Sequence, residues 1–298
     1  MAFKEIVEKL TSSPHRIYTA YDLSNLIFHI VVSHKKSLPK AKDIRRNINA
    51  LLSGEVITEK RCPGGSIFVV TGAEPPDPME FICAADMFSY VSHWSAMRYH
   101  EFEGTGTPDS LYISNPDPTV WRKCANERIS KDFSDFLEAF YEGDFLRPIK
   151  ISPSKIGTLQ VINTYTSQYE SAFQVQASYR VSTIGRTFLD MVRCPSRCGG
   201  ISQVIEVFQK NAHKYLDDIV GELNKCGKKI ETVRAGYLID EICGIHDPAI
   251  HEWLKNVQRG GSRKLDPNNG YMPIFSEKWC LINVNYYSRP TTIIIPVS

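Results

Sequence analysis

Residues 38–70 read LPKAKDIRRNINALLSGEVITEKRCPGGSIFVV, and they predict a basic helix followed at once by a β-hairpin. Pro39 suits the first turn of a helix, where its missing N–H is no loss, and Gly54 can end the helix. Apolar residues recur at three- and four-residue spacing along one face of this helix: Ala41, Ile44, Ile48, Leu51 and Leu52. The turn Pro63-Gly64-Gly65 then separates two short runs with strand character.

The opposite side of the predicted helix is cationic. The polar residues outside the apolar stripe are Lys40, Lys42, Arg45, Arg46 and Asn49. A helix that is buried on one side and basic on the other, followed by a hairpin, is how a winged helix-turn-helix faces DNA. Lys60 and Arg61 lie beside the hairpin turn, where they are expected to contact the DNA backbone or the minor groove. The alternative is that this basic face is simply solvated or binds protein.

The residues before this stretch agree with a small DNA-binding domain. Residues 3–10 and 20–29 have the apolar spacing of two further amphipathic helices. Residues 1–72 hold 11 Lys+Arg against 6 Asp+Glu, a net charge of +5, while the whole chain carries only +2. Residues 73–298 therefore carry −3, so the positive charge gathers in the segment that is predicted to meet the phosphate backbone.

The chain length of 298 residues favours two domains over one. Three prolines at positions 75, 76 and 78 forbid a helix and predict a stiff linker over residues 73–79. The expected division is therefore a winged helix-turn-helix over 1–72 and a larger mixed α/β domain over 80–298. Within that larger domain, residues 79–100 are expected to be helical and residues 280–285 and 292–295 to be strands. The fold class is α+β.

Composition and motifs exclude several classes of protein. No run of about 18 apolar residues predicts a membrane span, and the N-terminus has no apolar signal region, so a cytoplasmic location is expected. Phosphate loops, dinucleotide-binding loops and nucleophile elbows are missing, and His251-Glu252 lacks the second histidine of a zinc-protease motif. The eight cysteines form no Cys-x-x-Cys pair. We therefore expect no enzyme activity, no cofactor and no metal site, with His93 as a hydrogen-bonded core residue.

Three stretches of the larger domain carry a family resemblance. They are Tyr90–Ala96 (YVSHWSA), Val181–Asp190 (VSTIGRTFLD) with Pro195 and Cys198-Gly199-Gly200 downstream, and Arg234–Leu238 (RAGYL) with Lys264–Pro267 (KLDP) downstream. Together they resemble the AbiEi family of antitoxins from bacterial type IV toxin–antitoxin systems. The resemblance covers most of residues 80–285, and the region 102–149 does not align with it.

The resemblance implies a function for each part of the chain. The N-terminal domain would bind an operator with inverted repeats, as a homodimer on double-stranded DNA, and repress its own operon. The larger domain would counteract a toxin with a nucleotidyltransferase fold. Arg186, Asp190, Arg234 and Tyr237 are the motif residues of that domain; Arg186 and Asp190 are four apart and can pair on one helix face. Their roles are either fold maintenance or contact with a partner. The first alternative is a stand-alone winged-helix regulator whose second domain dimerises or senses a ligand. The second is an enzyme with an unrecognised site, which a deep pocket lined by converging ionisable groups would favour.

Overall fold

The computed structural model describes residues 2–35, 38–72, 74, 76–102, 109–176, 179–258, 263–268 and 275–282. The chain is mixed α and β, as predicted, and it divides into two compact units. The first unit comprises Met1–Val91, Pro108–Tyr169 and Val175–Arg180, and the second comprises Ser92–Thr107, Glu170–Gln174 and Val181–Ser298. In the part of the chain that is described, every helix is too short or too polar to cross a membrane. The strand expected at residues 292–295 lies outside the described residues.

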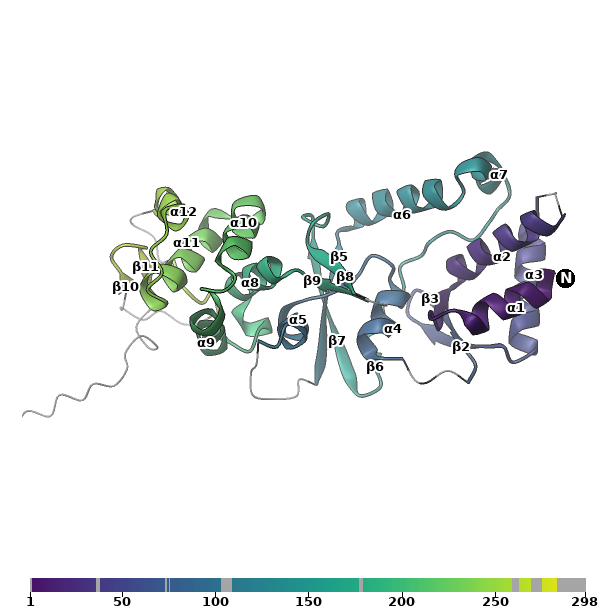
Figure 1. Ribbon diagram of the computed structural model, residues 1–298, viewed down its shortest axis with the longest axis horizontal. Coiled ribbons are helices and arrows are strands. Elements are labelled where there is room, and N and C mark those ends of the chain that lie inside the picture. The colour runs from purple at the N-terminus through teal and green to yellow at the C-terminus, as the bar shows by residue number, and fades with distance from the viewer. Residues whose placement is uncertain are drawn as a thin grey trace, which may run out of the picture. The chain divides into compact units, whose positions relative to one another are not determined.

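The helix and hairpin predicted from residues 38–70 are both present (Figure 1). The elements of the first 72 residues are α1 (Ala2–Ser12), β1 (Ile17–Thr19), α2 (Ala20–Lys35), α3 (Ala41–Ser53), β2 (Ile57–Cys62) and β3 (Gly65–Val70). The strands form an antiparallel sheet in the order β1-β3-β2. At the start of α3, the Asp43 carboxylate accepts a hydrogen bond from the Lys40 backbone N–H at 3.2 Å. Ile44, Ile48 and Leu51 then bury one side of the helix, as their spacing predicts.

The strand β3 is buried on both faces of this small sheet. Phe68 of β3 belongs to the core that α1, α2 and α3 form, whereas its neighbour Ile67 packs with Ile17, Phe81 and Ile151 on the other side. Adjacent residues of a strand point to opposite faces, so β3 lies between two clusters of apolar side chains, while most of β2 stays exposed.

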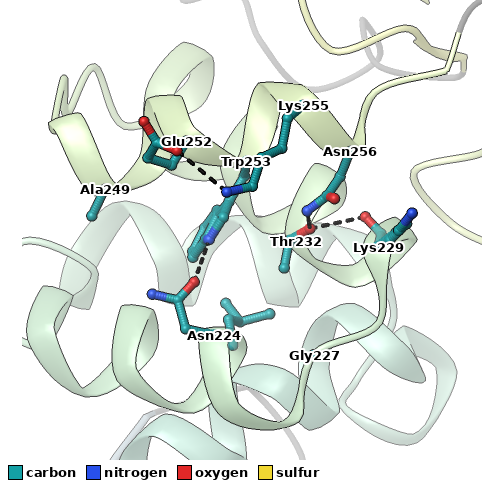
Figure 2. A pocket seen from close by; sticks show the side chains of 10 residues that line it. Asn224, Gly227, Lys229, Thr232, Ala249, Glu252, Trp253, Lys255 and Asn256 are labelled. Atoms are coloured by element: carbon teal, nitrogen blue, oxygen red, sulfur yellow. Dashed lines mark hydrogen bonds and ion pairs between the residues drawn. The ribbon is translucent and has the colours of Figure 1, made fainter.

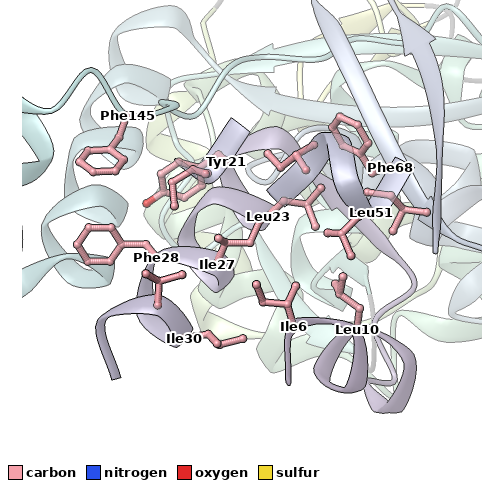
Figure 3. Packing of buried hydrophobic residues seen from close by; sticks show 14 of the residues in the cluster. Ile6, Leu10, Tyr21, Leu23, Ile27, Phe28, Ile30, Leu51, Phe68 and Phe145 are labelled. Atoms are coloured by element: carbon pink, nitrogen blue, oxygen red, sulfur yellow. The ribbon is translucent and has the colours of Figure 1, made fainter. Parts of the chain in front are cut away.

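Aromatic packing joins α2 to a segment far along the chain. Phe28 of α2 meets the rings of Phe133, Phe136 and Phe145 edge-on, with centroid distances of 5.0, 5.5 and 5.3 Å. Phe133 in turn lies 4.5 Å from Phe140. Figure 3 shows Phe28 and Phe145 at one end of the core that also holds Ile6, Leu10 and Leu51 of the N-terminal helices.

The rest of the first unit surrounds a second sheet. Its elements are α4 (Pro78–Ala85), β4 (Tyr90–Val91), β5 (Ser110–Pro116), α6 (Pro118–Asp132), the 3-10 turn η1 (Ser134–Phe136), α7 (Leu137–Glu142), β6 (Lys155–Ile156) and β7 (Leu159–Thr166). Two further strands of this sheet, β8 (Phe173–Gln176) and β9 (Tyr179–Ser182), each contain residues of both units. The sheet order is β6-β7-β5-β4-β9-β8. β5 and β7 run parallel and are joined through α6 and α7, so residues 117–149 belong to this crossover.

The single helical region expected over residues 79–100 is wrong, because the chain breaks between α4 and α5 (His93–Tyr99) to form β4. Asp86 ends α4 in an extended conformation, and its carboxylate accepts the Phe88 backbone N–H at 3.0 Å. The guanidinium of Arg180 donates to the carbonyls of Cys83, Asp86 and Ser89 at 2.5 to 3.0 Å. These carbonyls at the helix end are satisfied by a distant side chain, which no local sequence pattern could indicate.

The second unit is mainly helical. Its elements are α5, α8 (Ile184–Arg193), η2 (Pro195–Arg197), α9 (Ile201–Asn211), α10 (Leu216–Cys226), α11 (Lys229–Tyr237), η3 (Leu238–Ile242), α12 (Pro248–His251), η4 (Glu252–Asn256), β10 (Phe275–Ser276) and β11 (Leu281–Ile282). η2 and η4 are 3-10 turns, and η3 is a π-helical turn that continues α11. β10 and β11 pair with each other. Of the strand expected over 280–285, residues 281–282 form β11, and residues 283–285 lie outside the described residues.

The division into units differs from the boundary expected at residues 73–79. The first 72 residues share their core with Phe133, Phe140 and Phe145, and they belong to the same unit as β5, α6 and β7. A proline-rich stretch indicates where the backbone is stiff, but it says nothing about which apolar surfaces pack together. The compact unit that carries α3 therefore extends well beyond residue 79.

We predict that Phe133→Ala destabilises the protein by about 3–5 kcal/mol, because the ring is buried among four aromatic neighbours. Tyr141→Ala is the matched control: this ring is 44% exposed, and its removal should change stability by no more than about 0.5 kcal/mol. Urea denaturation of both variants measures the difference. Equal stabilities would contradict a core shared between residues 1–72 and the α6–α7 segment.

Candidate nucleic-acid interface

Four of the five polar residues predicted on the basic helix share one exposed face of α3, and the fifth is exposed just before it. Lys40 directly precedes the helix, and Lys42, Arg45, Arg46 and Asn49 are all exposed on it. The side chains of Arg45 and Arg46 are 53% and 75% exposed. Because Ile44, Ile48 and Leu51 hold the opposite side in the core, this face is fixed in orientation while its charges stay in water.

Acidic side chains border this face, and one of them comes from a distant part of the chain that no local spacing could indicate. Arg46 pairs with Asp43 of its own helix at 3.6 Å, and Arg45 pairs with Asp144 at 3.3 Å. The Asp144 side chain is 88% exposed, so the second pair is a surface ion pair of roughly 0–1 kcal/mol. A phosphate group can replace such a partner at little cost.

A groove of about 570 Å³ lies between the start of α3 and the end of α7. Lys40, Lys42 and Arg45 line one side of it, and Glu142 and Asp144 line the other. Part of the basic face thus lies opposite carboxylates across the groove, and the rest of it is exposed to solvent. An anion that approaches Arg45 meets these two acidic groups, whereas one that approaches Arg46 meets Asp43.

Lys60 and Arg61 are exposed on β2 but lie on opposite faces of the sheet. Lys60 is opposite Ile67 in the hairpin, and its ammonium lies 5.7 Å from the ring centroid of Phe81. Arg61 is opposite Ser66 and alternates with Lys60, so it lies on the face that α1, α2 and α3 cover. Of the two wing residues, Arg61 is therefore the one that shares a face with the basic helix.

The tip of the hairpin contacts a distant segment of the chain. The Ser152 backbone N–H donates to the Pro63 carbonyl at 3.0 Å, and Gly64 adopts φ 93°. A Cβ on Gly64 would lie 2.3 Å from the Lys150 carbonyl oxygen, so the turn needs glycine for both its conformation and its close approach. The tip residues thus contact the segment 149–152, while Pro63 and Gly64 keep exposed surface.

The motif residues of the second unit are buried and engaged. Arg186 pairs with Asp190 at 3.6 Å, as the four-residue spacing predicts, and with Glu222 of α10 at 3.2 Å. Arg186 and Asp190 are 1% and 3% exposed. Gly185 lets α10 approach closely, because a Cβ there would lie 2.3 Å from the Asp218 carbonyl oxygen. This cluster joins α8 to α10 within the interior.

Arg234, Tyr237 and His93 are also interior residues. Arg234 donates to the carbonyls of Val192 and Lys264 at 3.1 and 3.0 Å, and burial lowers its pKa from the ordinary value. Tyr237 is 2% exposed at the end of α11. His93 is hydrogen-bonded to the Ser92 hydroxyl at 2.8 Å and burial lowers its pKa, which confirms the prediction of a core histidine. In this arrangement the motif residues hold the second unit together.

The second unit also contains a pocket of about 540 Å³ between α10, α11 and η4 (Figure 2). The Trp253 indole donates to Asn224 at 2.7 Å, Asn256 donates to Thr232 at 3.0 Å, and Lys255 pairs with Glu252 at 3.3 Å. These polar groups satisfy one another across the pocket. The pocket has the size for a small ligand but gathers no acid, base and nucleophile at one point.

No family model and no curated protein matches the sequence. Among solved structures, the crystal structure of the RV2827C protein from Mycobacterium tuberculosis is similar to this chain. Its TM-score is 0.49 at 11% sequence identity, over 94% of this chain and 90% of that one. A likeness at this level carries no inference about function.

If the basic face of α3 and the α3 side of the hairpin bind one duplex, Arg61→Ala should weaken DNA binding more than Lys60→Ala. Arg61 lies on that side of the sheet, while Lys60 lies over Phe81 on the other. The Arg61 variant should also reduce the slope of the logarithm of the binding constant against the logarithm of the salt concentration by about one, as loss of a phosphate contact does. Fluorescence anisotropy with random duplex DNA at several salt concentrations measures both effects. A larger effect of Lys60→Ala would reverse the assignment.

Arg186→Leu should cost about 3–5 kcal/mol of stability, because it leaves the Glu222 and Asp190 carboxylates buried without their guanidinium partner. Thermal unfolding of both proteins tests this. A small deficit would show that the ion pairs are not what stabilises this site.

Proposed function

We propose that this protein is a DNA-binding antitoxin that represses its own type IV toxin–antitoxin operon in the cytoplasm. The observation that carries the proposal is the exposed cationic face of α3, held by a helix–strand–helix–helix–hairpin arrangement. This is the order of elements of a winged helix-turn-helix, in which such a helix enters the major groove. Base contacts from Arg45, Arg46 or Asn49 would supply specificity, and Lys40, Lys42 and Arg61 would contact phosphates.

The electrostatics of α3 support binding to a polyanion. Arg45 pairs with an exposed carboxylate and Arg46 with a partly exposed one, and a phosphate backbone can displace such partners. One α3 helix reads one half-site, so an operator with inverted repeats would take a homodimer, with the two half-sites spaced by about one helical turn. Linking two half-sites also raises the affinity well above that of a single helix.

The antitoxin part of the proposal rests on the resemblance of the three motifs to AbiEi proteins. Their central residues Arg186, Asp190, Arg234 and Tyr237 are buried, so they would act by shaping the second unit rather than by touching a toxin. Contact with a nucleotidyltransferase-type toxin would then use exposed residues that the motifs position. We propose no chemical reaction and no cofactor for this function.

A stand-alone transcriptional regulator is the second candidate, and the pocket between α10, α11 and η4 is the observation that favours it. Its volume of about 540 Å³ suits a small ligand that could modulate DNA binding. The neighbouring gene separates the two candidates: a nucleotidyltransferase gene in the same operon supports the antitoxin, and its absence supports the regulator.

The double variant Arg45→Ala, Arg46→Ala should lose repression of its own promoter but keep the ability to rescue cells from the partner toxin. Both residues lie on α3 in the first unit, whereas the antitoxin motifs lie in the second. A base contact is worth roughly 1–3 kcal/mol, so the two substitutions together should weaken operator binding at least tenfold. Promoter reporter activity and toxin rescue are measured in parallel. Lys229→Ala, Lys255→Ala removes the same charge from the second unit and should leave repression intact.

Unchanged repression by the Arg45→Ala, Arg46→Ala variant would remove α3 as the DNA reader. Intact repression by the unmodified protein without any rescue of toxin-expressing cells would leave the DNA-binding role and eliminate the antitoxin role.

A further inference from the structure

Asp240 occupies an unusual place in the second unit. It lies in η3, the π-helical turn over Leu238–Ile242, where the Cys243 backbone N–H bonds to the Leu238 carbonyl at 2.9 Å. π-Helical turns are rare and occur often at functional sites. The Asp240 side chain is only 1% exposed, yet two solvent-exposed histidines face it. Packing explains why Asp240 is buried, but it does not explain why two exposed imidazoles lie against its carboxylate.

The three side chains converge on one point. Oδ1 of Asp240 lies 2.8 Å from Nδ1 of His246 and 3.9 Å from Nε2 of His251, and all three atoms lie within 4.8 Å of one another. Bonds of about 2.0–2.2 Å at tetrahedral angles place neighbouring ligand atoms roughly 3.3 Å apart. The two distances to Oδ1 straddle this value, so small rotations of two exposed imidazole rings complete the geometry.

The other carboxylate oxygen of Asp240 is held by two donors. Oδ2 accepts a hydrogen bond from the Trp279 indole at 2.9 Å and pairs with the Lys278 ammonium at 2.6 Å. This leaves Oδ1 directed at the histidines. Carboxylates that ligate metals are commonly oriented by such donors to the oxygen that does not ligate.

The surrounding structure fixes each contributor. Trp279 is fully buried against Gly236, where a Cβ would lie 2.2 Å from the indole ring, so glycine in the RAGYL motif makes room for the group that orients Asp240. Asp247 caps α12 by accepting the Ala249 N–H at 2.7 Å. The buried Trp253, which bonds to Asn224 in Figure 2, anchors the turn that follows His251.

We propose that Asp240, His246 and His251 form a binding site for a divalent transition-metal ion of the zinc class. Two imidazole nitrogens and one carboxylate oxygen are ligands that Zn²⁺ accepts in tetrahedral coordination, with water at the fourth position. The site joins η3 to α12, so the ion would tie the end of α11 to the segment that carries Trp253. The ligands are separated by five and four intervening residues, which match no familiar zinc motif, and the shape of the π turn is what brings them together.

The proposal is tested with Co²⁺ as a spectroscopic probe on the full chain after treatment with a chelator. We expect one equivalent of Co²⁺ to give the visible absorption of a low-coordinate site, without the ultraviolet band of a thiolate ligand, and Zn²⁺ to displace it. The variant His246→Ala, His251→Ala should lose this signal. Both side chains are at least half exposed, so the variant keeps its fold, which circular dichroism verifies.

The matched control is His15→Ala, His213→Ala, which removes two exposed histidines outside the cluster and should bind Co²⁺ like the unmodified protein. Lys278→Gln should weaken binding by about 10–100-fold, as loss of an outer partner does, without abolishing it. Three results would overturn the proposal: no binding of Co²⁺ or Zn²⁺ by the unmodified protein, equal binding by the variant that lacks His246 and His251, or a signal dominated by thiolate ligation. In each of these cases Asp240 and His246 form only a hydrogen-bonded pair.

Discussion

Phe28 packs against Phe133, Phe136 and Phe145, and this contact determines how the first unit is built. The rings come from segments that are far apart in the chain, so their burial holds α6 and α7 against α2. Apolar burial is the dominant favourable term in folding, and aromatic side chains bury the largest areas. The first 72 residues consequently complete their core with side chains from beyond residue 130.

The same contact sets the surroundings of the basic helix. Once α7 is fixed by Phe140 and Phe145, Glu142 and Asp144 follow directly and lie along the groove beside Lys42 and Arg45. The cationic face of α3 is thus bordered by carboxylates that come from another part of the chain. Solvent exposure keeps these ion pairs weak, so the face remains available to a polyanion, and the acids narrow the directions from which a duplex can approach.

In the second unit, the charged residues that stabilise the fold are buried, whereas the histidines that could bind a ligand are exposed. Arg186, Asp190 and Glu222 place charges in the interior, where each charge depends on its partners, and Arg234 binds two backbone carbonyls there. Polar groups with such partners specify one packing arrangement rather than a surface for recognition. By contrast, His246 and His251 stand at the surface around one buried carboxylate, an arrangement suited to binding.

The sequence by itself determined the local elements of this protein. The spacing of Ile44, Ile48 and Leu51 determined which side of α3 is buried, and therefore that Arg45, Arg46 and Asn49 face solvent. The turn at Pro63-Gly64-Gly65 determined the hairpin, and the four-residue spacing of Arg186 and Asp190 determined their pairing. These features depend on helix and strand periodicity, which is a property of neighbouring residues.

Only the tertiary structure decided which distant groups meet. The first 72 residues do not form a compact unit of their own, because Phe28 packs against aromatic rings from beyond residue 130. The helix expected over residues 79–100 is interrupted where the Arg180 guanidinium donates hydrogen bonds to the carbonyls of Cys83, Asp86 and Ser89. Three further contacts have no sequence period either: Asp144 beside Arg45, Ser152 beside the hairpin tip, and Asp240 beside His246 and His251. Such contacts depend on how buried surfaces fit together across the whole chain, and no local pattern of residues encodes that fit.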